Sequence, residues 1–323
     1  MKNVNVSCGV KGMYKIQVLD RGNIVEDRPW AKNMILDQGL DYALSGSYNS
    51  VGCLMQYHCV GTGTNPVLAS NTGLQAEVKR TGTLLTGDGN VGRTYSSGVV
   101  TFRFTFDHTV EGAGGANYTE HGVSPSDTAG NNLFARSLIS GGTVSVAEGQ
   151  QLRVIYDVSV ALTPYTQTSA TVGGTGWPVS PATNCDGIFT LWNLNSIAGE
   201  LSTTGDLSSN SLICMSALGL PSLYACSSVT LPTGIDGSGD KTEISGSRIE
   251  YSRSSYTPGS FTRSFTPNAY ATASSFSSTS IIGWAITSDY SQDAIIFKYN
   301  QAQTKANTHR LRYPSITVTW ARA

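Results

Sequence analysis

The chain has 323 residues, a formal net charge of −1 and only 13% charged side chains, while 39% of its residues are hydrophobic. This is enough apolar material to fill a core and too much for intrinsic disorder. A nucleic-acid groove needs a stripe of Lys and Arg to displace counterions from phosphates, so the near-zero charge disfavours a nucleic-acid partner. Because no apolar run approaches the roughly 20 residues that cross a bilayer and the first residues lack a secretory signal, we expect no membrane insertion and synthesis in a cytoplasm.

The first elements in the chain are expected to be a hairpin and a short helix. Apolar and polar residues alternate over 14–18 before turn-forming residues at 20–23, which is typical of a β-hairpin with its second strand at 24–25. Between residues 33 and 44 the apolar side chains recur at helical spacing. Asn33 is placed to cap the first turn, so the pattern predicts a helix there.

Further strands are predicted before residue 164, at 54–60, 76–80, 100–106, 118–124, 132–139 and 152–162. The two long ones, 100–106 and 152–162, alternate apolar and polar residues without a break. A period of two sustained this long indicates a sheet with one face on a core. About eight strands then precede Pro164, which favours an antiparallel β-sandwich of two sheets.

The amino-acid composition of the sequence changes after Pro164. Residues 166–181 are rich in Thr, Ser, Gly and Pro and are predicted to be a linker. Shorter strands are predicted beyond it, at 187–192, 251–266, 280–287, 294–299 and 315–320. The predicted fold is therefore mainly β, with one short helix in a β-sandwich assembly domain at 1–165 and a second β-rich domain with long Ser, Gly and Thr loops at 182–323.

Histidines and cysteines offer two possible metal sites. His108 and His121 each lie beside a carboxylate and could form a pair if their strands were adjacent, but no third ligand has a diagnostic spacing. Cys53, His58 and Cys59 do not have zinc-ribbon spacing. Surface or hydrogen-bonded histidines and buried free thiols are the favoured interpretations, the latter for all six cysteines.

Other chemical motifs are incomplete. Asp236, Ser238 and Asp240 alternate as in a calcium loop, but the twelfth position is Ser247 rather than the Glu of an EF-hand. No G-x-S-x-G elbow is present, and Asp157 is more simply explained by a bond to a neighbouring Arg than by catalysis. The sequence therefore predicts no catalytic residues, no metal site and no cofactor.

Four segments of the predicted N-terminal domain resemble the N-terminal β-domain of structural virion proteins of tailed bacteriophages. They are VGTGTNP (60–66), YTEHGV (118–123), NNLFAR (131–136) and GQQLRVIYDVSVAL (149–162). YTPGSFTRSFTP (256–267) and ITVTWAR (316–322) are similar to the second module of such chains. The quoted segments cover both halves of the chain but under a fifth of its length.

The resemblance implies a non-enzymatic subunit of the virion, made in the host cytoplasm and placed in the tail, baseplate or tail-fibre attachment region. It would assemble as a homo-oligomer and dock to other virion proteins. No heptad repeat, collagen-like repeat or β-helical repeat is present, which favours a compact piece over a long fibre. The strand predicted to pair with neighbouring subunits consists of Ser315, Ile316, Thr317, Val318, Thr319 and Trp320.

An alternative function is binding of host cell-surface carbohydrate through loops of the C-terminal half. The aromatic side chains that could stack on sugars, or else lie in an interface, are Trp177, Trp192, Trp284 and Tyr290. A glycan-degrading enzyme is disfavoured because no pair of acids has a credible strand context.

Overall fold

A computed structural model describes residues 4–45, 54–85, 92–96, 99–162, 166–167, 187–191, 222–230, 240–268, 278–287, 293–305 and 315–323. This described part is mainly β, with a short helix α1 (Asp37–Ser45), which confirms the predicted fold class. It contains no helix with the length and apolar character needed to cross a membrane.

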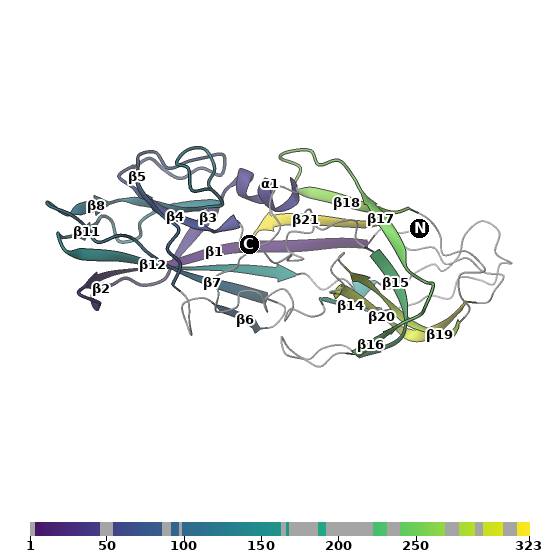
Figure 1. Cartoon of the computed structure of the whole chain (residues 1–323). Coiled ribbons are helices and arrows are strands. Elements are labelled where there is room, and N and C mark those ends of the chain that lie inside the picture. Colours follow the sequence, from purple (N-terminus) through teal and green to yellow (C-terminus); the bar gives the residue numbers. More distant parts are fainter. Residues whose placement is uncertain are drawn as a thin grey trace.

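Strand β1 (Val4–Asp20) is a central strand of the molecule, because it is paired along both edges (Figure 1). On one edge it runs antiparallel to β12 (Gln150–Leu162) over thirteen residue pairs. The other edge is used by three strands in succession: β21 (Ile316–Arg322), which is parallel to β1, then β3 (Ala31–Ile35), then β2 (Asn23–Asp27). The first and last strands of the chain therefore lie side by side.

The sheet around β1 continues on both sides. Beyond β12 follow β7 (Val99–Asp107) and β6 (Gly92–Ser96). Beyond β21 follow β18 (Thr262–Pro267) and β17 (Ile249–Arg253). We call this the first sheet.

A second sheet packs against the first in the N-terminal half. Its order is β5 (Glu77–Thr81), β4 (Tyr57–Gly61), β9 (Glu120–Ser124), β10 (Ala135–Leu138) and β3, and β3 also pairs with β1. A two-stranded sheet is formed by β8 (Ala116–Tyr118) and β11 (Val144–Val146). Two layers are present as predicted, joined by β3, but the first sheet is mixed rather than antiparallel because β1 and β21 are parallel.

A third sheet lies in the C-terminal half (Figure 1). Its order is β13 (Thr166–Gln167), β14 (Gly187–Leu191), β20 (Asp293–Lys305), β19 (Ser278–Thr287), β15 (Ser222–Thr230) and β16 (Asp240–Glu243). Strand β17 pairs with β15 as well as with β18, so it connects this sheet to the first.

The alternation in the sequence sets both faces of the first sheet. On the inner face, Tyr14 is opposite Tyr156, which is opposite Phe104, and all three are almost fully buried. On the outer face, Asp157 is opposite Arg103 and accepts bonds of 2.8 and 2.7 Å from it, as the sequence suggested. Such cross-strand pairs fix the register, because a one-residue slip would bring every apolar side chain to the solvent.

Several element boundaries differ from prediction. Asn33 does not cap α1, because it lies in β3, and the first helical bond runs from the amide of Leu40 to the carbonyl of Leu36 at 3.1 Å. The single strands predicted at 118–124 and 251–266 are each two strands, since Thr119 turns the chain from one sheet to another and a turn at Gly259, with φ of 80°, separates β17 from β18.

Strands β15 and β16 were not predicted. These strands contain five Ser and Thr residues, which are typical of loops. The strand conformation of β15 is stabilised by pairing with β19, an interaction that the local sequence pattern does not indicate. In the predicted linker, Thr166 and Gln167 form the short strand β13, while 168–181 lie outside the described residues. The last strand, β21, belongs to the first sheet rather than to the third.

Candidate functional site

Three of the four histidines of the chain meet between the two layers of the sandwich. His58 on β4 and His121 on β9 share the inner face of the second sheet, and His108 follows the last residue of β7 in the first sheet. His58 Nδ1 lies 2.8 Å from His108 Nε2, and His58 Nε2 lies 3.2 Å from His121 Nδ1. At the far end, Asn33 Nδ2 lies 3.3 Å from His121 Nε2. These four residues form what we call the histidine chain.

The direction of the hydrogen bonds follows from the asparagine. An amide NH₂ group can only donate, so Nε2 of His121 accepts and its Nδ1 carries the proton. That proton is donated to His58 Nε2, and the Nδ1–H of His58 is donated in turn to His108 Nε2. All three rings are therefore Nδ1–H tautomers. Within the described residues, His108 Nδ1 at one end and Asn33 Oδ1 at the other have no partner.

Burial keeps the histidine chain neutral. All three rings are at most 1% exposed. Desolvation, with the neighbouring Lys79, lowers the pKa of His108 to about 3, and desolvation with the neighbouring His108 lowers the pKa of His121 to about 3. The pKa of His58 is also well below its ordinary value, first through burial and then through electrostatic coupling to His108 and His121. A neutral ring supplies one donor and one acceptor, which is what each link of the chain requires.

A buried ion pair lies on the opposite face of the second sheet. Glu120 is fully buried, and its carboxylate is 2.8 Å from the guanidinium of Arg136. The same carboxylate accepts backbone N–H bonds from Gly63 at 3.0 Å, Gln75 at 3.1 Å and Ala76 at 2.8 Å. Glu120 thus holds both ends of the loop between β4 and β5. We call Glu120, Arg136 and these three amides the carboxylate hub.

The glycines of the VGTGTNP segment allow this approach. A Cβ atom on Gly63 would lie 2.3 Å from a carboxylate oxygen of Glu120, and one on Gly61 would lie 2.4 Å from the carbonyl oxygen of Ala76. Neither distance is possible between real atoms, so only glycine lets the backbone reach the carboxylate. Residues 62–66 of the segment form an irregular loop, and the Gly63 amide binds a carboxylate of the same protein.

The two sites differ in what they can do chemically. The histidine chain links the two sheets through direct hydrogen bonds between ring nitrogens, with spacings of 2.8 and 3.2 Å. Among the described residues, no group of three His, Cys, Asp or Glu side chains is arranged to hold a metal ion. The carboxylate hub is a fixed charge pair whose atoms are occupied by the protein itself. Both sites join separate segments of the chain.

The proposed assembly strand is not an open edge. Over Ile316–Thr319 it is paired with β1 on one side and with β18 on the other, and the side chains of Val318 and Trp320 are buried. Its backbone bonds are satisfied within the chain, which removes the free edge that pairing with a neighbour would need.

Most of the other predicted site residues lie outside the part of the chain that the structure describes. Trp177, Trp192 and Tyr290 are outside the described residues, and Trp284 lies in β19, opposite Ala225 of β15. Asp240 begins β16, whereas Asp236 and Ser238 are outside the described residues.

The cysteines that the structure describes agree with the prediction. Cys8, Cys59 and Cys226 are buried and form no disulfide, and burial raises the pKa of Cys8 to about 12. Cys59 points away from the histidine chain and donates its thiol to the carbonyl of Gly122 at 3.3 Å. Cys53, Cys185 and Cys214 lie outside the described residues.

Sequence reasoning found parts of the histidine chain but not the whole. His108 and His121 were paired as a conditional metal site, yet their strands lie in opposite sheets and His58 stands between them. Asn33 was expected to cap a helix and Arg136 was noted only within the NNLFAR segment, so neither was predicted as part of these sites. The single clue was that Glu120 and His121 are adjacent on a strand, so that one must face the core and the other the loop.

Comparison of the chain with family models, curated proteins and solved structures gave no match.

Proposed function

We propose that this protein is a non-enzymatic structural subunit of a tailed-phage particle, located in the tail, baseplate or tail-fibre attachment region. It acts by forming a homo-oligomer and docking to other virion proteins. The observation that carries the proposal is the double pairing of β1, which joins the first and last strands of the chain in one continuous sheet. A subunit that transmits mechanical force between its neighbours is stabilised when its first and last strands are paired in one sheet.

The carboxylate hub supports the proposal, because it unites the segments behind the phage resemblance. VGTGTNP supplies the amide of Gly63, YTEHGV supplies Glu120, and NNLFAR supplies Arg136. Arg136 also donates to the carbonyl of Asn65 at 3.2 Å. Three segments far apart in the sequence thus contribute to one buried ion pair and its hydrogen bonds, which explains why their residue types occur together.

Other polar side chains likewise fix loops rather than line an open site. Arg28 donates to three backbone carbonyls in the turn at 140–143, at 2.7 to 3.2 Å. Asp41 on α1 accepts bonds from the hydroxyl of Tyr256 and from the amide of Gly259, the latter at 2.8 Å. Loops held this way keep their shape, which lowers the entropic cost of docking.

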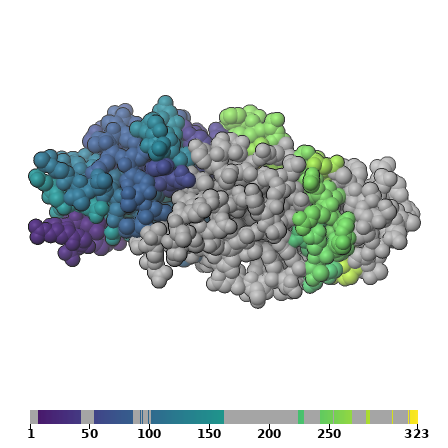
Figure 2. All heavy atoms as spheres, viewed as in Figure 1, coloured from purple at the N-terminus to yellow at the C-terminus, as the bar shows by residue number. Residues whose placement is uncertain are grey.

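The outer strand β2 is the contact that we assign to a second copy of the chain. It pairs with β1 alone among the described strands, so its other edge is open. Ile24 and Val25 on this strand are 52% and 55% exposed. Figure 2 shows this purple segment projecting from one end of the molecule. An open edge with exposed apolar side chains is suited to pairing with an identical strand.

A nonsense mutation in the gene of the encoding phage tests the proposal. In a host without a suppressor tRNA, the mutant is expected to yield particles that lack a tail part or fail to join heads to tails, as seen by negative-stain electron microscopy. Growth of the same mutant in a host with a suppressor tRNA is the matched control. Morphologically complete particles that infect normally would contradict the proposal.

A further inference from the structure

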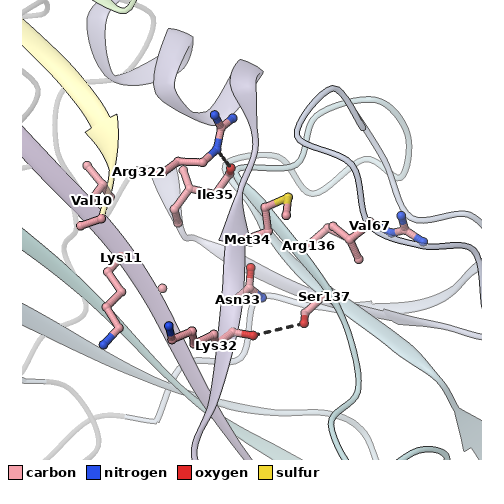
Figure 3. A pocket seen from close by; sticks show the side chains of 12 residues that line it. Val10, Lys11, Lys32, Asn33, Met34, Ile35, Val67, Arg136, Ser137 and Arg322 are labelled. Carbon is pink, nitrogen blue, oxygen red and sulfur yellow. Dashed lines mark hydrogen bonds between the residues drawn. The ribbon is translucent and has the colours of Figure 1, made fainter.

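A pocket of about 320 Å³ lies at the crease where the first and second sheets meet. Lys11 of β1, Lys32 of β3, Arg136 of β10 and Arg322 of β21 all line it. No Asp or Glu side chain of the described residues is part of its wall. In Figure 3 the two lysines lie on one side, and Arg136 and Val67 on the other. The pocket is therefore lined by four cations from four different strands.

The two arginines are already neutralised. Arg136 is 2% exposed and bonds Glu120, the side chain of Asn71 and the carbonyl of Asn65. Arg322 donates to the carbonyl of Ile35 at 2.5 Å and pairs with Asp37. These bonds hold both guanidinium groups in place and leave no net charge on either pair.

The two lysines are not neutralised. Lys32 lies next to β1 opposite Met13, and Lys11 is two residues from Met13, so both side chains emerge from the same face. Neither amine has a hydrogen bond or ion pair within the described part of the chain. Two ammonium groups that line one pocket repel each other, and an anion between them would relieve that repulsion.

We propose that this pocket binds a small anion with a carboxylate or phosphate group, held between Lys11 and Lys32. Ammonium groups donate charge-assisted hydrogen bonds to such oxygens. Met34, which is 38% exposed, and Val67 add apolar surface to the lining of the pocket. A ligand with a short apolar part beside its charged group therefore matches the pocket. This inference is independent of the proposed role in a phage particle.

Methyl NMR of the full chain, labelled at its methionines, tests the proposal. Sodium phosphate and sodium butyrate are titrated separately at constant ionic strength. The Met34 methyl resonance is expected to shift saturably, while that of Met55, which is 0% exposed, stays in place. Saturation with phosphate alone identifies an oxyanion site, and saturation with butyrate identifies a carboxylate site with an apolar contact.

A double variant, Lys11→Gln with Lys32→Gln, is expected to weaken binding of the saturating anion about tenfold or more, because two charge-assisted bonds are lost. The matched control is Lys15→Gln, on the same strand and face but paired with Asp27 at 2.8 Å. Its binding constant is expected to stay within about twofold of the original protein. Absence of a saturable Met34 shift with both anions, or equal affinity in the double variant, overturns the proposal.

Discussion

Gly63 is a glycine because its backbone touches a buried carboxylate. The Cβ of an alanine there would collide with Glu120 and with Cβ of Gln75. We expect Gly63→Ala to lower the free energy of unfolding by about 1–3 kcal/mol, the usual cost of forced overpacking. The matched control is Gly112→Ala, where the added methyl meets nothing within 4 Å. Urea unfolding measures both, and equal stabilities of the two variants would show that the close approach is not required.

The histidine chain makes stability depend on pH. Because the folded pKa values of His108 and His121 are about 3 and the ordinary value is 6.5, the unfolded chain binds more protons between these limits. Stability is then complete above pH 6.5 and falls as the pH drops below it. Each histidine contributes up to about 1.4 kcal/mol per pH unit, and all three up to about 4. Urea unfolding at pH 7, 6 and 5 measures this slope.

A His108→Gln variant should lose about one third of that slope, since one of three titrating rings is gone. Nitrogen-15 spectra provide an independent check, in which His58, His108 and His121 remain neutral Nδ1–H tautomers at pH 5. Equal stability of the original protein at pH 7 and pH 5, or a protonated ring at pH 5, would mean that the three histidines are not held neutral by the fold.

Strand β21 shows how an element can differ from its expected role. Since both of its edges are paired over Ile316–Thr319 and Trp320 is 2% exposed, its removal should unfold the adjoining sheet. Trp320→Ala is expected to lower the free energy of unfolding by about 3–5 kcal/mol. Thr319→Ala, on the other face of the same strand, is the control and should cost much less. Similar melting temperatures for the two variants would contradict the burial of this strand.

The sequence pattern correctly predicted those elements that are determined by interactions within one segment. The alternation over 100–106 and 152–162 indicated strands β7 and β12 and the buried faces of Phe104 and Tyr156, because a period of two is a property of the segment itself. The helix start was placed wrongly, because the side chain of Asn33 is used by His121, 88 residues away. A competing long-range bond leaves no mark on the local sequence.

The candidate sites were harder to predict for the same reason. The contacts of His58 with His108 and His121 span 50 and 63 residues. They depend on the packing of two sheets, which no single segment encodes. The carboxylate hub was not predicted, because the close approach that requires the glycines of VGTGTNP depends on the position of Glu120, far away in the sequence.

For the molecule as a whole, the open edge of β2 predicts self-association. Replacing Ile24 and Val25 by serine removes exposed apolar surface without disturbing the core. In sedimentation velocity, the original protein is expected to form oligomers whose fraction rises with concentration, and the double variant to shift toward monomer. Val110→Ser is the control, because Val110 is 56% exposed but lies outside β2. Identical sedimentation of all three proteins would exclude β2 as the contact.

The most direct test of the proposed role is an image reconstruction of the phage particle to which we assign this protein. We predict repeated copies of the β1 and β12 sheet around a symmetry axis of the tail, baseplate or fibre attachment region, with β2 at the contact between copies. A complete, well-resolved particle with no density for this fold would contradict the account.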